Sequence, residues 1–260
     1  MPELPEVETV VRTLRPQVLG RVIVEARVLA PLILKGKPEP QLNGMRIVDV
    51  TRHGKTILIW LDQGVLSIHL GMTGKLLVNA AQGTHTRAWF TLDQGLLIYD
   101  DIRMFGRVEF SAQLPPHLAA LGPDPLLVSP QEFAARLAGR KTRIKPLLLN
   151  QKFLRGLGNI YADESLFRAG IHPETLACKL KPLQVRKLHL AIVEILRASI
   201  DAGGSSISDY VDSDGRKGSF QQQHRVYAMQ GKPCTLCGSP ITRIVVAQRG
   251  THYCKRCQKR

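Results

Sequence analysis

The sequence predicts a multidomain chain of the α+β class: an antiparallel β-sandwich with an amino-terminal helix, then a helical domain, then a β-hairpin module that binds a metal. Three observations support this prediction. Runs of β-branched and aromatic residues fill residues 21–111, helical periodicity dominates after residue 130, and four of the five cysteines come after residue 233. At 260 residues the chain can bury a sizeable core in one or two domains.

The predicted sandwich rests on segments such as RIVDVTRHGKTILIWL and GVLSIHL, which have strand composition. The tripeptide DQG recurs at 62–64 and 93–95 and predicts two hairpin turns. Ahead of the strands, Pro5 is acceptable in the first turn of a helix, whereas Pro16 would kink or end that helix early. The residues of the predicted helical stripe are Val7, Val10, Val11, Leu14 and Val18.

Five prolines between Leu114 and Pro130 favour a linker, and the pattern changes to helices after it. We therefore predict a sandwich at 1–114, a linker at 115–130, a helical domain at 131–222 and a cysteine module at 223–260. In the longest predicted helix the residues on one face are Val185, Leu188, Ile192, Ile195 and Ser199, and Gly203 with Gly204 supplies the stop. The stretch SSISDYVDSDGRKGS that follows has turn composition and is expected to be a mobile loop.

The chain carries 36 Lys+Arg against 21 Asp+Glu, a formal net charge of +15. Seven Lys/Arg and no acidic residue lie between Phe133 and Ala162, and ten between Gly215 and Arg260, again without an acid. Such stretches are typical of a surface that binds nucleic acid, although a basic face exposed only to solvent is the alternative. Because no apolar run approaches 18 residues and no export signal is recognisable, we expect a cytoplasmic protein.

Four cysteines form two close pairs, CTLC at Cys234 and Cys237 and CKRC at Cys254 and Cys257, with sixteen residues between the pairs. Two thiolate pairs on neighbouring hairpin turns can converge tetrahedrally on Zn²⁺, so we predict one structural zinc ion per chain. Disulfides are the alternative. The intervening RIVVAQRGTHY would form the hairpin of this module, and Cys178 stands alone.

Several motifs resemble those of the bacterial formamidopyrimidine-DNA glycosylases. They are PELPEVETV at the start, RHGK, HLGMTG, DIRMFG, GLGNIYADE and the terminal AQRGTHYCKRCQ, in the family's order over nearly the whole chain. The resemblance implies a β-sandwich, a helix-two-turns-helix domain and a zinc finger. It also implies an enzyme that excises oxidised purines such as 8-oxoguanine or formamidopyrimidines from double-stranded DNA and then nicks the strand at the abasic site.

The amino terminus is the predicted chemical centre. Removal of the initiator Met would leave Pro2 with a free secondary amine, and α-amino groups have an ordinary pKa near 7.7–8.0, so part of the population can attack a sugar carbon. Glu3 is placed to protonate the deoxyribose ring oxygen, a role that the resemblance also implies. Glu6, one helical turn further, could hold or relay protons. Alternatively, Glu3 and Glu6 are acids that complement the helix dipole.

Other site residues follow from the resemblance. Lys55 in RHGK matches the lysine that reaches a phosphate beside the lesion and assists β-elimination, and Arg249 at the finger tip matches the arginine that grips phosphates and aids δ-elimination. Without the motifs, each would be taken for an exposed turn residue. Asn159 could cap the helix that it precedes while the helix terminus accepts a phosphate. The remaining positions that match DNA contacts are His69, His85, Lys141 and Tyr227.

Flipping a base out of the helix leaves a gap that side chains must fill. Met72, Arg103 and Phe105 match the family's gap-filling residues, with Arg103 facing the orphaned cytosine, and apolar wedges of this kind stabilise kinked DNA. A core position is the alternative for Met72 and Phe105. Met104 stands where the family commonly has a basic residue, which lowers the expected phosphate affinity there. The stretch 205–220 matches the family's loop that closes over the everted base, and no strong hydrophobic anchor is evident in it.

Two other functions stay open at this point. An endonuclease VIII-like enzyme for oxidised pyrimidines shares the Pro-Glu start and the finger, although PELPEVET and DIRMFG favour the purine branch. A non-catalytic DNA-binding protein could keep the same scaffold. One finger and one active centre per chain indicate a monomer, bacterial and associated with the nucleoid through DNA.

Overall fold

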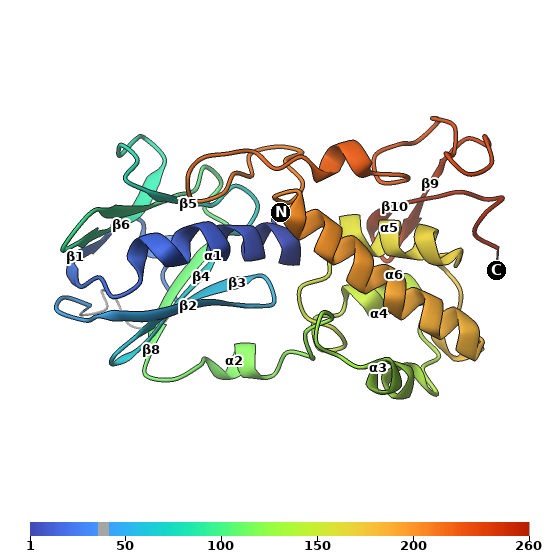
Figure 1. Cartoon of the computed structure of the whole chain (residues 1–260), viewed down its shortest axis with the longest axis horizontal. Helices are drawn as coiled ribbons and strands as arrows, with labels where there is room; N and C mark the ends of the chain where they lie inside the picture. Colours follow the sequence, from blue (N-terminus) through green and yellow to red (C-terminus); the bar gives the residue numbers. More distant parts are fainter. Residues whose placement is uncertain (36–41, 260) are drawn as a thin grey trace. The chain divides into compact units, whose positions relative to one another are not determined.

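The computed structural model describes residues 1–35 and 42–259 (Figure 1). It divides into two units, of which the first comprises Met1–Ala120 with Ile200–Gln221 and the second comprises Leu121–Ser199 with Gln222–Arg260. The finger thus shares a unit with the helices, and residues 200–221 share one with the strands. The predicted division into four parts, at 1–114, 115–130, 131–222 and 223–260, stays a prediction. Residues 36–41 of the predicted β region lie outside the described residues.

The described part of the first unit holds two antiparallel four-stranded sheets. The strands are β1 (Ile23–Val28), β2 (Ile47–His53), β3 (Thr56–Leu61), β4 (Gly64–His69), β5 (Lys75–Val78), β6 (Thr86–Leu92), β7 (Leu96–Asp100) and β8 (Arg107–Ser111). Their order is β1-β6-β7-β5 in one sheet and β2-β3-β4-β8 in the other. Both DQG tripeptides lie at hairpin turns, between β3 and β4 and between β6 and β7, which confirms the predicted turns.

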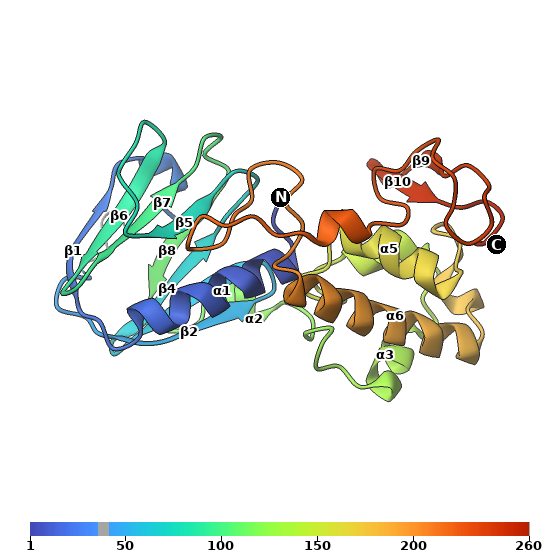
Figure 2. The same cartoon turned by 45° about the horizontal axis from the view of Figure 1, so that its top comes forward.

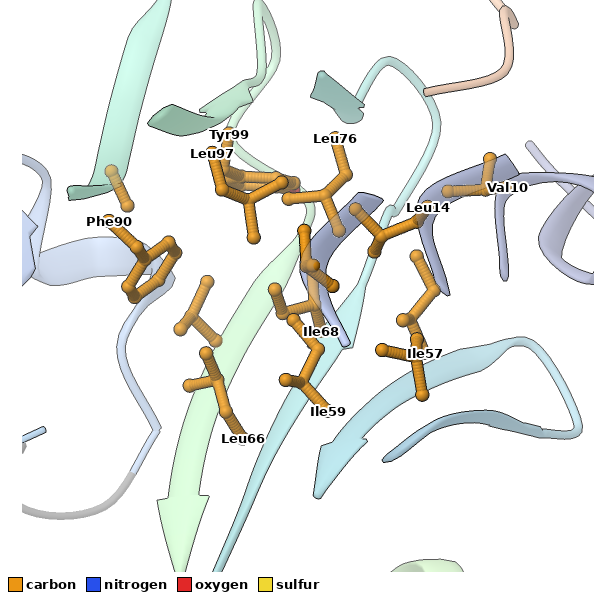
Figure 3. Close-up of a cluster of buried hydrophobic side chains, with 14 of the residues drawn as sticks. Val10, Leu14, Ile57, Ile59, Leu66, Ile68, Leu76, Phe90, Leu97 and Tyr99 are labelled. Carbon is orange, nitrogen blue, oxygen red and sulfur yellow. The ribbon is translucent and has the colours of Figure 1, made fainter. Parts of the chain in front are cut away.

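Apolar side chains of the two sheets face each other and form the core of this unit (Figure 3). Ile59 and Leu66 come from one sheet, Phe90 and Leu97 from the other. The helix α1 (Leu4–Val18) buries its predicted stripe against the same core. The helix includes Pro16 and ends two residues later. It tolerates this proline because a proline so near the end removes only one helical hydrogen bond.

The loop that follows Asp201 is anchored on the first unit. Tyr210 is only 6% exposed and belongs to the sandwich core. Its hydroxyl donates to the carbonyl oxygens of Glu6 (3.2 Å) and Gly203 (3.1 Å), and Ser213 Oγ bonds Thr13 Oγ1 at 2.7 Å. The prediction that this stretch lacks a hydrophobic anchor is therefore wrong, because one aromatic side chain among small polar residues supplies it.

The second unit is helical with a β-hairpin at its end. Its helices are α3 (Pro130–Leu137), α4 (Ile144–Leu149), α5 (Asn159–Ala169) and α6 (Pro182–Asp201), its strands β9 (Thr242–Val246) and β10 (Arg249–Tyr253). Figure 2 shows α5 between the β9–β10 hairpin and α6, and Tyr161 on α5 bonds Ser199 on α6 at 2.6 Å. Of the predicted α6 stripe, Leu188, Ile192, Ile195 and Ser199 are buried, whereas Val185 is half-buried.

The proline-rich segment before these helices contains one short helix, α2 (Pro116–Ala119). Short 3-10 turns occur at Pro31–Ile33, Ala177–Lys179 and Phe220–Gln223. Among the described residues, no helix is long and apolar enough to span a membrane.

Candidate functional site

Pro2 and Glu3 are buried where α1 begins. Glu3 is the N-cap residue and is 3% exposed, and it forms a capping box with Glu6, whose Oε2 accepts a hydrogen bond from the Glu3 backbone N–H at 2.8 Å. The capping box stabilises the first turn of the helix and orients its acids. Both acids therefore lie at the helix terminus, as the alternative of acids that complement the helix dipole requires. The catalytic role of Glu3 stays a prediction.

Glu6 connects the helix start to the loop after α6. Its side chain is 1% exposed, and Oε1 accepts a hydrogen bond from Ser205 N at 2.8 Å. Both carboxylate oxygens therefore hold backbone N–H groups, one of α1 and one of the loop. This geometry gives Glu6 a structural task within the first unit, and a proton-relay role stays a prediction.

Lys55 and His69 lie at the same end of the β2-β3-β4-β8 sheet. Lys55 is in the turn between β2 and β3, and His69 ends β4 opposite Thr56. Burial, together with the positive charges of Lys55 and Arg107, lowers the pKa of His69 to about 4, so its ring is neutral at pH 7. Gly71 N donates to His69 Nδ1 at 3.1 Å, which leaves Nε2 as the protonated nitrogen that can donate to a phosphate.

The three gap-filling candidates lie on two loops of the first unit. Met72 is 39% exposed and Phe105 is 53% exposed, so neither is a core residue and the core alternative is wrong for both. Arg103 is exposed, and its guanidinium carbon lies 4.7 Å from the centroid of the Phe105 ring. Met104 has a positive φ of 54° and packs against the sandwich core.

Arg249 is exposed at the start of β10, beside the turn of the finger hairpin. Ala247 (φ 47°) and Gln248 (φ 61°) form this turn, and Arg249 pairs with Val246 across it. Positive φ at both central residues gives a turn whose twist matches the hairpin. The position at the tip is as predicted, and the phosphate contact stays a prediction.

Asn159 does not cap α5. The N-cap is Gly158, Asn159 is the first helical residue, and its Nδ2 donates to the carbonyl oxygen of Gly250 at 2.9 Å. The capping prediction is therefore wrong, since the amide group reaches β10 instead of its own helix. The side chain thereby ties the start of α5 to the residue that follows Arg249.

A buried ion pair that was not predicted from the sequence strengthens the same connection. Lys145 Nζ lies 2.6 Å from Asp163 Oδ1 with both side chains fully buried, and it also donates to Thr251 Oγ1 at 2.8 Å. Asp163 Oδ2 in turn accepts from His252 N at 2.8 Å. Lys145 thus lies in the interior of its unit, although its charge contributes to the basic stretch between Phe133 and Ala162. The apolar run IKPLLL around it was the sequence signal that could have predicted this burial.

The other predicted contacts lie on both units. His85 and Lys141 are exposed, in loops of the first and the second unit. Tyr227 is half-buried between the rings of His224 and His252, with centroids at 5.7 and 5.3 Å, and its backbone N–H donates to Glu164 at 2.8 Å. Pro2, Glu3, Lys55 and the gap-filling residues thus belong to the first unit, and Asn159, Tyr227 and Arg249 to the second.

The four paired cysteines form a metal centre. Their sulfur atoms all lie within 4.8 Å of one another, and none is in a disulfide. Cys234 and Cys257 are 3.9 Å apart, Cys237 and Cys254 are 3.5 Å apart, and a tetrahedral Zn²⁺ with bonds of about 2.3 Å requires sulfur separations of roughly 3.8 Å. The geometry fits four thiolates around one structural zinc ion, whereas Cys178 is exposed and takes no part.

An antiparallel sandwich with Pro2 and the buried Glu3 at the start of its first helix, followed by helices and a four-cysteine hairpin, defines a DNA glycosylase with a zinc finger. Family models match three regions: the formamidopyrimidine-DNA glycosylase N-terminal domain at residues 1–108, the H2TH domain of the same enzymes at 121–211, and the zinc finger found in FPG and IleRS at 231–260. The chain belongs to the formamidopyrimidine-DNA glycosylase family.

Curated relatives and solved structures agree. The chain is 54% identical over 265 residues to the formamidopyrimidine-DNA glycosylase of Solibacter usitatus and 43% identical over 278 residues to that of Bacillus subtilis, covering at least 99% of each chain. It is 41% identical to the MutM (FPG) crystal structure from Thermus thermophilus, with a TM-score of 0.91 and coverage of 99% and 98%. A wild-type Lactococcus lactis Fpg bound to N7-benzyl-Fapy-dG DNA shows 37% identity, a TM-score of 0.91 and full coverage of both chains, and a MutM complex with carbocyclic 8-oxo-G DNA shows 36%, 0.91 and the same coverage.

Proposed function

We propose that this chain removes oxidised purines, such as 8-oxoguanine and formamidopyrimidines, from double-stranded DNA and then cuts the strand at the abasic site by β,δ-elimination. The observation that carries the proposal is the Pro2–Glu3 pair at the start of α1 in a chain of this family. The solved relatives that hold oxidised or modified purines in DNA support the purine class of substrate.

The first step would be attack by the Pro2 nitrogen on C1′ of the damaged nucleotide, once Met1 has been removed. The N–C1′ bond forms while the glycosidic bond breaks, and the base leaves with its bonding electrons. The attacking nitrogen then loses its N–H proton, which balances the proton that the departing base takes up. Glu3 would protonate the deoxyribose ring oxygen, so that the sugar opens to a cationic iminium. Because proline is a secondary amine, this iminium has no N–H proton to lose and persists as an electron sink.

Elimination would follow from the iminium. Loss of a C2′ proton expels the 3′-phosphate, and a second elimination expels the 5′-phosphate. The ammonium of Lys55 and the guanidinium of Arg249 would neutralise the charge on these leaving groups, and guanidinium suits a bidentate phosphate contact. A role for Glu6 in proton transfer is compatible with this scheme, in addition to its two backbone hydrogen bonds.

The remaining residues would hold the DNA. Met72, Arg103 and Phe105 fill the gap that the everted base leaves, with Arg103 facing the opposite cytosine. Phosphates would be contacted by His69, His85, Lys141, Asn159 and Tyr227. The zinc ion supplies no chemistry to the reaction, because its four cysteines form a closed structural site that supports the hairpin carrying Arg249. We place the enzyme as a monomer in the bacterial cytoplasm, associated with the nucleoid through DNA.

The test uses two duplexes that differ in one lesion, 8-oxoguanine opposite cytosine in the first and thymine glycol in the second. We expect faster release of 8-oxoguanine and a cut strand with phosphate at both ends. A preference for thymine glycol would favour the pyrimidine branch, and binding without any base release would favour a non-catalytic protein. Glu3→Gln should lower base release by about 10²- to 10⁴-fold with DNA binding retained, as for the loss of a general acid.

A further inference from the structure

Two loops at the end of the sandwich carry the gap-filling residues. The first wedge loop, residues 70–74, follows β4 and presents Met72; the second wedge loop, residues 101–106, follows β7 and presents Arg103 and Phe105. Neither loop has regular secondary structure, although all three side chains must be placed accurately to enter a DNA duplex. The exposed residues themselves do not explain how the two loops keep their positions.

Asp101, which is 0% exposed, joins the two loops through buried hydrogen bonds. Its Oδ1 accepts from Thr73 Oγ1 at 2.5 Å and from Arg103 N at 3.3 Å, and its Oδ2 accepts from Gly106 N at 2.8 Å and from Tyr99 Oη at 3.3 Å. Thr73 Oγ1 in turn accepts from Arg103 N at 3.0 Å. One carboxylate therefore connects Thr73 of the first wedge loop, Arg103 and Gly106 of the second, and Tyr99 on strand β7.

A carboxylate suits this set of partners, because each of its oxygens faces one backbone N–H and one hydroxyl. Each oxygen of Asp101 faces two donors, and a carboxylate is the side chain that accepts at both oxygens without donating. Burial raises the pKa of Tyr99 far above its ordinary value, so that its hydroxyl stays protonated and can only act as a donor to the acid. In Asp101→Asn, either orientation of the amide would set an NH₂ group against a backbone N–H, that of Arg103 or that of Gly106.

The backbones of the two loops are also in direct contact, so that no side chain fits between them. A Cβ built on Gly71 would lie 2.6 Å from Gly106 N and from the carbonyl carbon of Phe105, and one on Gly106 would lie 1.6 Å from the Tyr99 hydroxyl. Both positions therefore require glycine. Because the loops are in contact, a shift in the carboxylate's partners on one loop displaces the other as well.

We propose that Asp101 is the positioning residue for base eversion: its buried carboxylate sets Met72, Arg103 and Phe105 in the arrangement that enters the duplex. The inference rests on the proposed function, in which these residues replace the everted base. It distinguishes Asp101 from a residue that merely stabilises the sandwich, since its loss affects steps that need the wedge more than steps that do not.

The experiment compares wild type, Asp101→Asn and the control Asp93→Asn. Asp93 also accepts two backbone N–H groups in the same unit, from Val22 at 3.1 Å and Gln94 at 3.0 Å, but it is exposed at the β6–β7 turn. Three substrates are used: 8-oxoguanine opposite cytosine, 8-oxoguanine opposite adenine, and a preformed abasic site opposite cytosine. Cleavage at the abasic site needs no base eversion and reports that the variant is folded.

For Asp101→Asn we expect kcat/KM on 8-oxoguanine opposite cytosine to fall about 10- to 100-fold, as for a buried donor left unsatisfied. Cleavage at the abasic site should change less than about threefold, and the preference for cytosine over adenine should shrink, because Arg103 is no longer held. Thr73→Val, which removes only the link to the first wedge loop, should show the same pattern with a smaller loss. Asp93→Asn should match wild type on all three substrates.

Equal losses of Asp101→Asn on all three substrates, or wild-type behaviour, would overturn the inference. If Asp101→Asn fails to fold, Thr73→Val decides by the same criterion. If the wild-type enzyme releases no 8-oxoguanine, the proposed function is overturned, and the inference with it. If the wild-type enzyme releases 8-oxoguanine but the variants lose activity equally on all three substrates, the inference alone is overturned.

Discussion

The Glu6 carboxylate accepts one backbone hydrogen bond from α1 and one from the loop after α6. A glutamine has one acceptor oxygen, so one of the two N–H groups would face an amide NH₂. We expect Glu6→Gln to lower the free energy of unfolding by about 1–3 kcal/mol, measured by urea denaturation. The control is Glu25→Gln, which removes an exposed pair with Arg27 and should cost less than about 1 kcal/mol.

If Glu6 served only as a proton relay, Glu6→Gln would leave the urea transition unchanged and slow base release alone. That outcome would contradict the structural task assigned to it.

His69 makes the stability of the first unit depend on pH. Its pKa is lowered to about 4 by burial, against an ordinary value of 6.5, so between these pH values the unfolded chain binds a proton that the folded chain does not. Stability is therefore full above about pH 6.5 and is lost as the pH falls toward 4, by an amount of order 2 kcal/mol after allowance for partial exposure. In the second unit, burial lowers the pKa of His224 to about 4, so that unit loses stability over the same pH range.

His69→Gln should flatten this dependence in thermal unfolding between pH 7 and pH 4, whereas substitution of the exposed His85 should not. An unchanged slope in His69→Gln would show that the ring is not held neutral in the folded state.

At the scale of elements, α4, α5 and β10 meet around the Lys145–Asp163 pair. Lys145→Met would leave the Asp163 carboxylate buried and without its cation, which costs about 3–5 kcal/mol. The double variant Lys145→Met/Asp163→Leu should recover part of that loss, because it removes the remaining charge. Lys141→Met, at an exposed position, should change the urea midpoint little. Equal midpoints for Lys145→Met and Lys141→Met would contradict a structural role for the pair.

Elements with a repeated pattern were predictable from the sequence. The α6 stripe, the DQG turns and the paired cysteines each repeat a signal at a spacing that geometry requires. Tyr210 and Lys145 were not predictable in this way, because each is a single residue whose burial depends on a partner segment distant in the sequence. Asn159 follows a general rule for capping residues that its tertiary bond to Gly250 overrides.

The site shows the same division. Resemblance to a family predicts Pro2, Glu3, Met72, Phe105 and Arg249 as site residues, whereas residue type alone would have placed Met72 and Phe105 in the core. Asp101 lies inside the recognised DIRMFG segment, but its importance depends on four donors that only the folded chain brings together.

For the whole molecule, zinc links folding to DNA binding. The finger's small core of Phe167, Val226, Cys234, Ile241 and Cys254 includes two of the metal ligands, so removal of the ion should unfold residues 234–257. A chelator should then weaken DNA binding and reduce its salt dependence, since the finger's phosphate contacts are lost. The measurement is a titration of lesion-containing duplex at several salt concentrations. Unchanged affinity and salt slope in metal-free protein would contradict the role of the finger.

The central claim is that Pro2 becomes covalently bound to the sugar of the damaged nucleotide, and peptide mapping of a borohydride-reduced complex tests it most directly. The protein is produced with a removable amino-terminal extension, and each form is mixed with 8-oxoguanine duplex and borohydride. After cleavage to a free Pro2, we expect a stable adduct whose only modified peptide begins at Pro2 and carries the reduced sugar. An adduct on Lys55, or one that forms equally well while the extension is still attached, would contradict the mechanism.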